Sequence, residues 1–597
     1  MDQTFKEWCH NATEKFLQTV IIIDDGLRFN TDGDTSVPKK ASRLSGSLLA
    51  VDDSKKQAVS SPPFFPEPDT INPLNALDLT NAFFHKGIVA GLFKPTSEFK
   101  DHSIIEASVA VAMKCDVVII DWNLKNPGKT GASKDGQGVE DGGHLATRII
   151  VGLVSDDYQN GGRLRTIIVY TAEKDLIELR NELIDSLSRE EIKNSLTDNP
   201  IKFERMDDFS IVSPNLKVAF YSKPSGTTMD TGRKKSESEL PGVVIEEFSS
   251  HANGLLPAFA LSSTAAIRRN THHLLTRFSN DLDCAYLAHR GMIPDPEDAE
   301  PYMLENLVSV IRNTLSLEQV DREYLGERPI SLWTDQALNG GKTFTGKCHD
   351  KDVTFSPVEL KEVFLGGTEK LKELIKEKAG CDSKNIDFDK AFAEAGKLLE
   401  SGMSSENGLK RFSVLSSFKR SHEDIGWASS NNKPYLTQGT IIFFKSSGDK
   451  EKYLLCITPK CDCVRIRIGN GGQTWLQTPR KFSFVELKKK RKTEPHDLII
   501  NMNGTYIHLA TKDKFHELID ISFESDSSSF RVESVLNSSP KQFKFRDVDS
   551  KDYQWVGDLK DLHIQDRVST LVGNLNRVGL DEFEWLRIMK NGERKKK

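Results

Sequence analysis

Four short apolar runs near the start of the chain are each followed by polar side chains that could act together on a phosphoryl group. These runs are Val20–Ile23 before Asp24 and Asp25, Val117–Ile120 before Asp121, Ile167–Tyr170 before Thr171, and Val218–Tyr221 before Ser222, Lys223 and Pro224. Continuous β-branched runs are typical of strands buried on both faces, and open parallel α/β sheets gather functional groups beyond the strand carboxyl ends. We therefore expect three carboxylates, a hydroxyl and an ammonium at one sheet edge.

This set of groups predicts a magnesium site beside a nucleophilic carboxylate. Carboxylates crowded into one crevice repel each other unless a hard cation neutralises them, and oxygen-only ligands favour Mg²⁺. A remaining carboxylate oxygen can attack a phosphoryl group and form an aspartyl phosphate. The metal, a lysine and a hydroxyl would then hold the charged equatorial oxygens, which is most of what phosphoryl transfer requires.

Each of these residues, taken alone, also has a structural interpretation. An acid after a buried strand can cap the next helix, and Thr171-Ala172 before an acidic stretch is good helix N-terminus chemistry. The functional interpretation therefore rests on the combination of residue types, in this order, at four strand ends.

The segments between the apolar runs predict an α/β fold. Their apolar spacing predicts a short strand over Ile88–Phe93 and helices over Ala76–His85, Ile104–Met113, Gly143–Val154 and Asp175–Lys193.

At these residues the chain resembles the receiver domain of two-component response regulators. The resemblance implies the strand order 2-1-3-4-5, which is the flavodoxin-like winding. The resemblance implies that Asp24 and Asp25 are metal ligands and that Asp121 is the phospho-acceptor and a further metal ligand. It also implies that the backbone carbonyl of Asn123 completes the metal site.

The same resemblance implies roles for three residues on the last two strands. Thr171 would be the switch hydroxyl, Lys223 the cation that contacts the phosphate, and Phe220 the switch aromatic whose rotamer follows phosphorylation. The chain departs from the family in its spacing, because the domain closes only near residue 250. We expect insertions near residues 27–73 and 125–142, both at the active edge, where they could control access to Asp121.

The rest of the chain predicts two further domains. Residues 251–402 read as a helical linker or bundle, with apolar spacing over Val243–Phe259, Thr264–His289, Pro301–Leu315 and Val358–Lys378. Residues 403–597 read as a mainly β, small-barrel-like domain that ends in a helix from about Asp561. Its strand-like segments are residues 439–444, 453–458, 464–468, 474–477, 498–502 and 506–509.

Length, charge and cysteine usage indicate a multidomain cytoplasmic protein. The chain has 597 residues and a net charge of −6, and residues 1–19 are charged and amphipathic, unlike a signal or an anchor. A segment needs about 18 apolar residues to span a bilayer. No apolar run in the sequence approaches this length, so we expect no membrane partner. Cys456, Cys461 and Cys463 lack the paired spacing of a zinc site, and no helical face collects His272, His273 and His289 convincingly.

Nucleic acid is not an expected partner from the sequence. The chain carries two basic runs, Lys488–Lys492 and Arg594–Lys597, which read as a solvated loop and a solvated tail. No helix-turn-helix pattern, P-loop, helicase or nuclease signature is present.

Two carboxy-terminal segments, Tyr453–Arg465 and Asn576–Arg587, look similar to atypical receiver proteins of bacterial conflict systems. In such defensive, anti-phage two-component systems the partners are a histidine-kinase-type sensor and a separate effector. The sequence therefore predicts a regulatory phospho-acceptor in a phosphorelay, with Mg²⁺ as its cofactor. We do not expect an enzyme beyond self-catalysed phosphoryl transfer to Asp121.

Two alternatives remain open at this point. A pseudo-receiver would keep the fold and act as a scaffold without phosphorylation. An Mg²⁺-dependent phosphohydrolase could use the same acids, but Trp122-Asn123 after Asp121 leaves out the second acid of the usual Asp-x-Asp nucleophile motif.

Overall fold

The structure is a computed structural model. It describes residues 4–29, 74–95, 101–124, 143–160, 162–190, 192, 200–293, 296, 299–338, 343–348, 351–379, 407–421, 433–446, 450–459, 465–468, 472–475, 479–492, 494, 496–502, 504–511, 518–524, 531–538 and 541–575. Most of the predicted insertion at 27–73, all of that at 125–142, Cys461, Cys463, residues 576–587 and the basic run 594–597 lie outside them.

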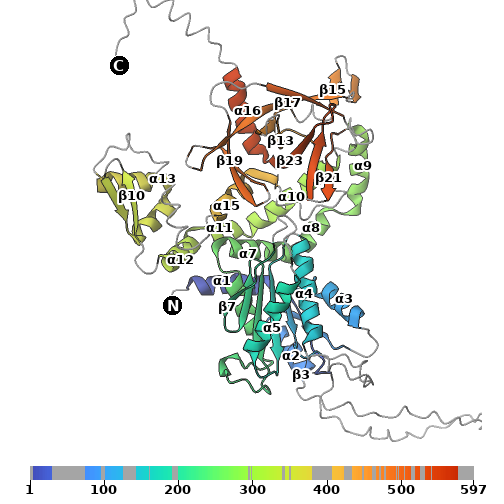
Figure 1. Cartoon of the computed structure of the whole chain (residues 1–597), viewed down its shortest axis with the longest axis vertical. Coiled ribbons are helices and arrows are strands. Elements are labelled where there is room, and N and C mark those ends of the chain that lie inside the picture. Colours follow the sequence, from blue (N-terminus) through green and yellow to red (C-terminus); the bar gives the residue numbers. More distant parts are fainter. Residues whose placement is uncertain are drawn as a thin grey trace, which may run out of the picture.

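The amino-terminal part contains a seven-stranded sheet in which five neighbouring strands are parallel and the last two pair antiparallel (Figure 1). In spatial order its strands are β4 (Val89–Phe93), β1 (Thr19–Ile23), β5 (Val117–Ile120), β6 (Arg165–Thr171), β9 (Leu216–Ser222), β8 (Ser210–Ser213) and β7 (Glu204–Asp207). All residues of β5, β6 and β9 are buried, as continuous apolar runs predict. The predicted parallel sheet is confirmed.

Helices cover both faces of this sheet. One face packs against α3 (Asp101–Ala112), α4 (His144–Gln159) and α5 (Leu176–Arg189), and the other against α2 (Ala76–His85) and α6 (Leu240–His251). The helix α1 (Phe5–Phe16) precedes β1 and begins with a capping box between Thr4 and Glu7. A two-residue parallel ladder, β2 (Leu27–Arg28) with β3 (Leu74–Asn75), joins the two ends of the first insertion.

The hairpin of β7 and β8 was not predicted from the sequence. It pairs antiparallel with β9 and so extends the sheet beyond the last parallel strand. Every residue of β7 is exposed, and its sequence, Glu-Arg-Met-Asp, has neither an apolar run nor a clear alternation. Only pairing with β8 makes it a strand.

The middle of the chain is mainly helical, but it differs from the prediction. Its elements are α7 (Leu255–Arg269), α8 (Thr271–Arg277), α9 (Asp283–Met292), α10 (Ala299–Leu317), α11 (Val320–Leu325), α12 (Glu327–Ala337), β10 (Phe344–Cys348), β11 (Lys351–Phe355) and α13 (Pro357–Ala379). The predicted helix 243–259 is broken at residues 252–254, and Pro257 lies in the first turn of α7, where its missing N–H costs no hydrogen bond. The predicted helix 264–289 is broken after Arg269, where the Asn270 side chain donates to the Ala266 carbonyl and ends α7.

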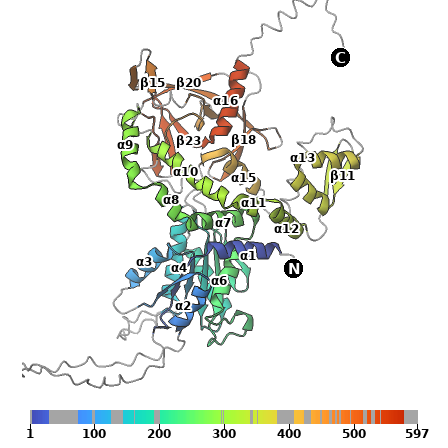
Figure 2. The same ribbon diagram turned by 180° about the vertical axis from the view of Figure 1, so that it is seen from behind.

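The hairpin of β10 and β11 corrects the expectation of a purely helical middle region. It pairs over five residues and packs against α13 (Figure 2). Thr345 and Thr354 lie opposite each other with hydroxyls 3.0 Å apart, a cross-strand contact that favours a hairpin. In this region the rings of His272 and His273 lie tilted at 4.0 Å between centres, and those of His289 and Tyr302 at 4.9 Å. No metal-ligand cluster forms among the described residues there.

The carboxy-terminal part is an antiparallel β-rich region, as predicted. Its ten-stranded sheet contains β12 (Phe418–Ser421), β13 (Thr440–Lys445), β14 (Glu451–Cys456), β17 (Arg480–Lys490), β18 (Leu498–Met502), β19 (Thr505–Thr511), β20 (Leu518–Phe523), β21 (Val535–Ser538), β22 (Lys541–Arg546) and β23 (Asp552–Leu559). A separate hairpin joins β15 (Arg465–Ile468) to β16 (Gly472–Trp475), and the helices are α15 (Asn407–Ser417) and α16 (Asp561–Leu575).

Six strands of this sheet close into a ring, in the order β17, β14, β13, β23, β22 and β20. β20 pairs with β17, and an isolated bridge between Phe523 and Asp547 links β20 to the end of β22. The ring encloses a core rich in aromatic residues, including Phe482, Phe523 and Trp555. A second apolar cluster lies between the sheet and the helices α15 and α16.

The helical region is fastened to the parallel sheet through α1 and α7. Trp8 of α1 packs with Ala258 and Ala266 of α7 in one apolar cluster. The Arg268 guanidinium binds Asp116, just before β5, with N–O distances of 2.8 and 3.2 Å.

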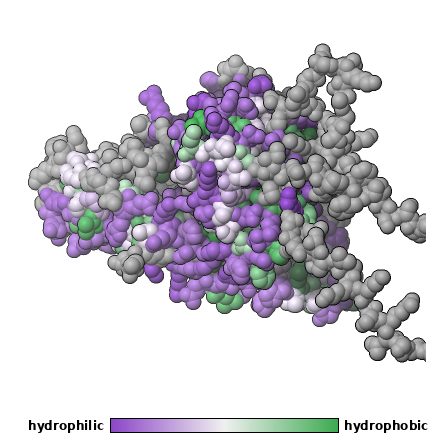
Figure 3. Space-filling view, turned by 90° about the horizontal axis from the view of Figure 1, so that it is seen from below, coloured by the Kyte–Doolittle hydropathy of each residue, from purple (hydrophilic) through white to green (hydrophobic). Residues whose placement is uncertain are grey.

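Viewed from below, the surface is mostly hydrophilic, with hydrophobic residues in separate small groups (Figure 3). Among the described residues, no helix is both long enough and apolar enough to cross a membrane.

Candidate functional site

The site lies at the carboxyl edge of the parallel sheet, where neighbouring strands deliver their last residues side by side. Ile23 of β1 pairs with Ile120 of β5, so the next residues, Asp24 and Asp121, leave the sheet together. The backbone holds them there, because the Asp121 amide donates to the Ile23 carbonyl at 3.0 Å. Each acid therefore continues the ladder of its own strand.

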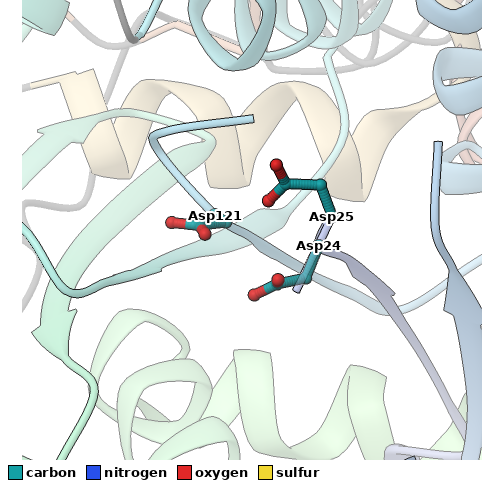
Figure 4. Close-up of side chains that lie close together, drawn as sticks. All are labelled: Asp24, Asp25 and Asp121. Atoms are coloured by element: carbon teal, nitrogen blue, oxygen red, sulfur yellow. The ribbon is translucent and has the colours of Figure 1, made fainter. Parts of the chain in front are cut away.

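Three carboxylates meet at this edge (Figure 4). One oxygen from each of Asp24, Asp25 and Asp121 lies within 4.8 Å of the others. Asp24 and Asp121 are buried, at 1% and 7% exposure, whereas Asp25 is half-buried. The cluster is thus closed on the protein side and reaches solvent through Asp25.

Lys223 balances part of this charge. Its ammonium lies 2.7 Å from Asp24 Oδ2 and 2.7 Å from Asp121 Oδ2, and the residue is 2% exposed. The Lys223 amide donates to the Thr171 carbonyl at 2.8 Å, which fixes the lysine at the end of β9. One cation therefore bridges two carboxylates delivered by different strands.

The protonation of the site reflects this crowding. Burial and the nearby Asp121 carboxylate raise the pKa of Asp24 to about 7, although Lys223 and the Gly26 amide oppose the change. Burial alone would lower the pKa of Lys223, but Asp121 and Asp24 raise it, so this lysine stays charged. Burial and the neighbouring carboxylate thus outweigh the effect of the ammonium on Asp24.

The donor set fits a divalent cation. Three carboxylates gather around one ammonium that bridges two of them, an excess of acids that suits a divalent cation. All three acidic ligands offer oxygen, the donor that Mg²⁺ prefers. Among the described residues this is the one group of acids, cysteines and histidines able to hold a metal ion.

Comparison with known families agrees with this geometry. Residues 16–227 match the family model of the response receiver domain. This protein carries a receiver domain. No curated protein and no solved structure matches the chain. A receiver domain indicates a response-regulator-like role in signal transduction, and receiver domains typically bind Mg²⁺ through such an acidic cluster.

The other predicted residues of the receiver domain lie around the cluster. Thr171 ends β6 at 1% exposure, and its hydroxyl accepts the Glu173 amide at 3.4 Å. Asn123 follows Asp121 by two residues, and its amide donates to Asp121 Oδ1 at 3.4 Å. Phe220 is fully buried on the face covered by α4 and α5, with its ring 6.3 Å from that of Trp122.

Two further contacts in the receiver domain were not predicted from the sequence. The Asn123 side chain donates to the Glu173 carboxylate at 3.1 Å, which brings a fourth acid into contact with the residue two positions after Asp121. Gly143 packs so closely on the Trp122 indole that a Cβ atom there would lie 2.3 Å from its Nε1. Trp122 and Asn123 closely follow the strand β5, but only the tertiary structure brings Gly143 and Glu173 into contact with them.

The segment after β9 also reaches this edge. Residues 224–239 turn back over the sheet, because Ser222 pairs with Lys234 in a parallel bridge. The Tyr170 hydroxyl donates to the Lys235 carbonyl at 2.7 Å, and the Asn75 amide donates to Glu237 at 3.0 Å. The segment thus links β6 and β9 to the start of α2 beside the pocket.

Proposed function

We propose that Asp121 accepts a phosphoryl group from a histidine-kinase partner and that the protein relays or buffers this signal. The observation that carries the proposal is the Lys223 bridge at 2.7 Å from both Asp121 and Asp24, within a cluster of three carboxylates. It supports an acceptor carboxylate that is buried beside a fixed cation. This arrangement favours charge development at that point.

The transfer step uses the Asp121 carboxylate as nucleophile. One of its oxygens forms a bond to phosphorus while the bond from phosphorus to the donor breaks, and the donor leaves with the electron pair. Lys223 lies where it can turn from Asp121 to an oxygen of the bound phosphoryl group. Since it is already fixed by the β9 backbone, little reorganisation is required.

Asp24, Asp25 and Asp121, with the backbone carbonyl of Asn123, would hold Mg²⁺. When bound, the ion supplies positive charge that lowers the repulsion between these acids and an incoming phosphoryl group. Asp24 and Asp25 follow one strand directly, so their backbone positions are fixed before any ligand binds.

The response to phosphorylation would begin at β6 and β9. A phosphoryl group adds about −1.5 to −2 of charge and three acceptor oxygens. Thr171 and Lys223 end neighbouring strands, which pair over seven residues, so movement of either side chain toward the phosphoryl group acts on the same pair of strands. Residues 224–239, bonded to Ser222 and Tyr170, would carry that movement outward.

We also place this protein in bacterial anti-phage defence, with a separate effector downstream. The support is the resemblance of residues 453–465 and 576–587 to receiver proteins of conflict systems, and the second segment lies outside the described residues. The location proposed for this function is the cytoplasm.

The test is phosphorylation of the full-length protein by acetyl phosphate with and without Mg²⁺, followed by intact mass. We expect one phosphoryl group on the wild type with Mg²⁺ and none on Asp121→Asn. The adduct should be lost in hydroxylamine, because an acyl phosphate is cleaved by it whereas a phosphoserine is not. Asp156→Asn, a change of the same kind outside the pocket, should leave the gain intact.

Two other results would redirect the assignment. If neither protein gains mass and Mg²⁺ does not bind, the domain is a pseudo-receiver scaffold. If phosphate is released steadily with many turnovers, the protein is a phosphohydrolase, and the acceptor role is wrong.

A further inference from the structure

The basic run Lys488–Lys492 does not stand alone once the chain is folded. Lys490 lies directly opposite His508 in the pairing of β17 with β19. His508 in turn contacts His496, which follows the basic run in the turn before β18. We call Lys410, Lys490, Lys492, His496 and His508 the basic patch.

The two histidines of the patch form an oriented pair. His508 Nδ1 lies 3.1 Å from His496 Nε2, and His496 Nδ1 lies 3.0 Å from the Glu494 carbonyl oxygen. A carbonyl oxygen only accepts, so His496 Nδ1 carries the proton and its Nε2 accepts from His508 Nδ1 when both rings are neutral. The lone pair of His508 Nε2 is then left for a proton or a ligand donor.

The surroundings of His508 are cationic. Burial, His496, Lys410 and Lys492 all lower the pKa of His508, with Lys410 coming from α15 and Lys492 from the turn after β17. The nearest acids in the same turn are engaged elsewhere. The Glu494 carboxylate accepts the Arg491 amide at 2.8 Å, and Asp497 accepts from Thr511 and pairs with Arg567.

Part of this positive charge has no acidic partner among the residues that the structure describes. Within the described chain, Lys488, Lys490 and Arg491 make no ion pair, whereas Lys489, on the opposite face of β17, lies 2.7 Å from Glu451. A chain with a net charge of −6 thus gathers cations from three elements at one end of its β-rich region.

Aromatic rings accompany these cations. Tyr506 lies two residues before His508 on β19, so both side chains are on the same face of the strand, and both are half-buried. The Lys410 ammonium lies 5.6 Å from the centre of the Tyr506 ring. Rings that can stack, set among lysines, suit unpaired bases on a phosphodiester backbone better than an acidic protein surface.

We propose that the basic patch, together with Tyr506, binds single-stranded nucleic acid. The lysines would contact phosphates, while Tyr506 and the His508 ring would offer surfaces for bases. This binding goes beyond the receiver function, since it uses a different part of the chain and needs no phosphorylation.

The test is fluorescence anisotropy of a labelled, mixed-sequence single-stranded oligonucleotide titrated with the full-length protein. For Lys490→Gln we expect about fivefold weaker binding in dilute salt and a salt slope smaller by about 0.7, as the loss of one phosphate contact predicts. For Tyr506→Leu, which keeps the apolar packing, we expect binding weaker by about fivefold or more. Lys489→Gln removes the same charge from the other face of β17 and should bind like wild type.

A second series separates nucleic acid from other polyanions. Binding should tighten as the pH falls from 8 to 6, because a phosphate beside His508 favours its protonated form, and His508→Ala should weaken this dependence. Heparin and anionic phosphatidylserine vesicles serve as competitors. The proposal is wrong if the oligonucleotide does not bind, if Lys490→Gln and Lys489→Gln behave alike, or if Tyr506→Leu has no effect and heparin binds as tightly as the oligonucleotide.

Discussion

The Arg268 guanidinium binds the Asp116 carboxylate at the start of β5, while Asp121 stands at the other end of the same strand. Asp116 also accepts the Gln18 and Thr19 amides at 3.0 and 3.1 Å, and Arg268 donates to the Phe16 carbonyl at 3.0 Å. One ion pair thus ties α7 to α1, β1 and β5. The helical region is therefore anchored to the strand that leads into Asp121, at the end opposite the acidic cluster.

Loss of this anchor should destabilise the receiver domain. Asp116 is almost fully buried and Arg268 about one-third exposed, so Arg268→Gln leaves a buried carboxylate without its cation. We expect a loss of about 2 kcal/mol in the free energy of unfolding, below the range for fully buried pairs. Urea unfolding measures this, and Arg269→Gln, whose partner Glu318 is partly exposed, should cost well under half as much.

Magnesium binding should depend on pH through Asp24. The pKa of Asp24 in the folded protein, about 7, lies above the ordinary value of 3.8. Between pH 3.8 and about 7 the folded apo protein therefore holds a proton that the unfolded chain has lost, and its stability falls as the pH rises through this range. A bound cation requires the carboxylate, so Mg²⁺ affinity should fall by about tenfold per pH unit below 7. Isothermal titration at pH 5.5, 6.5 and 8 measures this, and an affinity that is flat over the range would contradict the assignment.

Removing the lysine of the pocket should change the response to Mg²⁺. In Lys223→Met three carboxylates share the site with no ammonium, so the apo variant should unfold at lower temperature than wild type at pH 8. Added Mg²⁺ should raise the melting temperature of the variant by more than that of wild type. Lys174→Met, at an exposed position outside the acidic cluster, is the matched control. Equal Mg²⁺ responses in the two variants would contradict a role of Lys223 in balancing the charge of the acids.

The contact between Gly143 and Trp122 should be intolerant of a single methyl group. Gly143→Ala places Cβ 2.3 Å from Trp122 Nε1, directly beside the acceptor, and the overpacking should cost about 1–3 kcal/mol. We also expect slower phosphorylation of Asp121 by acetyl phosphate. Gly242→Ala meets nothing within 4 Å in α6 and should be neutral or slightly stabilising. Equal stability of both variants would show that the indole can move aside.

The sequence by itself determined the parallel strands and the chemistry at their ends. Val20–Ile23 and Val117–Ile120 are continuous β-branched runs, which bury on both faces of a sheet, and parallel pairing places the following Asp24 and Asp121 at one edge. These features depend on residues that are adjacent in the chain.

Only the tertiary structure decided which distant groups meet. The pairing of Arg268 with Asp116 and the contact of Lys410 with Tyr506 join residues that no spacing rule connects. The sequence predicted Lys223 at the same edge as the acids, but only the structure shows that it bridges two of them. The β7–β8 hairpin and the breaks in the predicted helices also arise in this way. Short or weakly patterned segments take their conformation from the surfaces they pack on, because their local preferences cost less than the burial and pairing they gain.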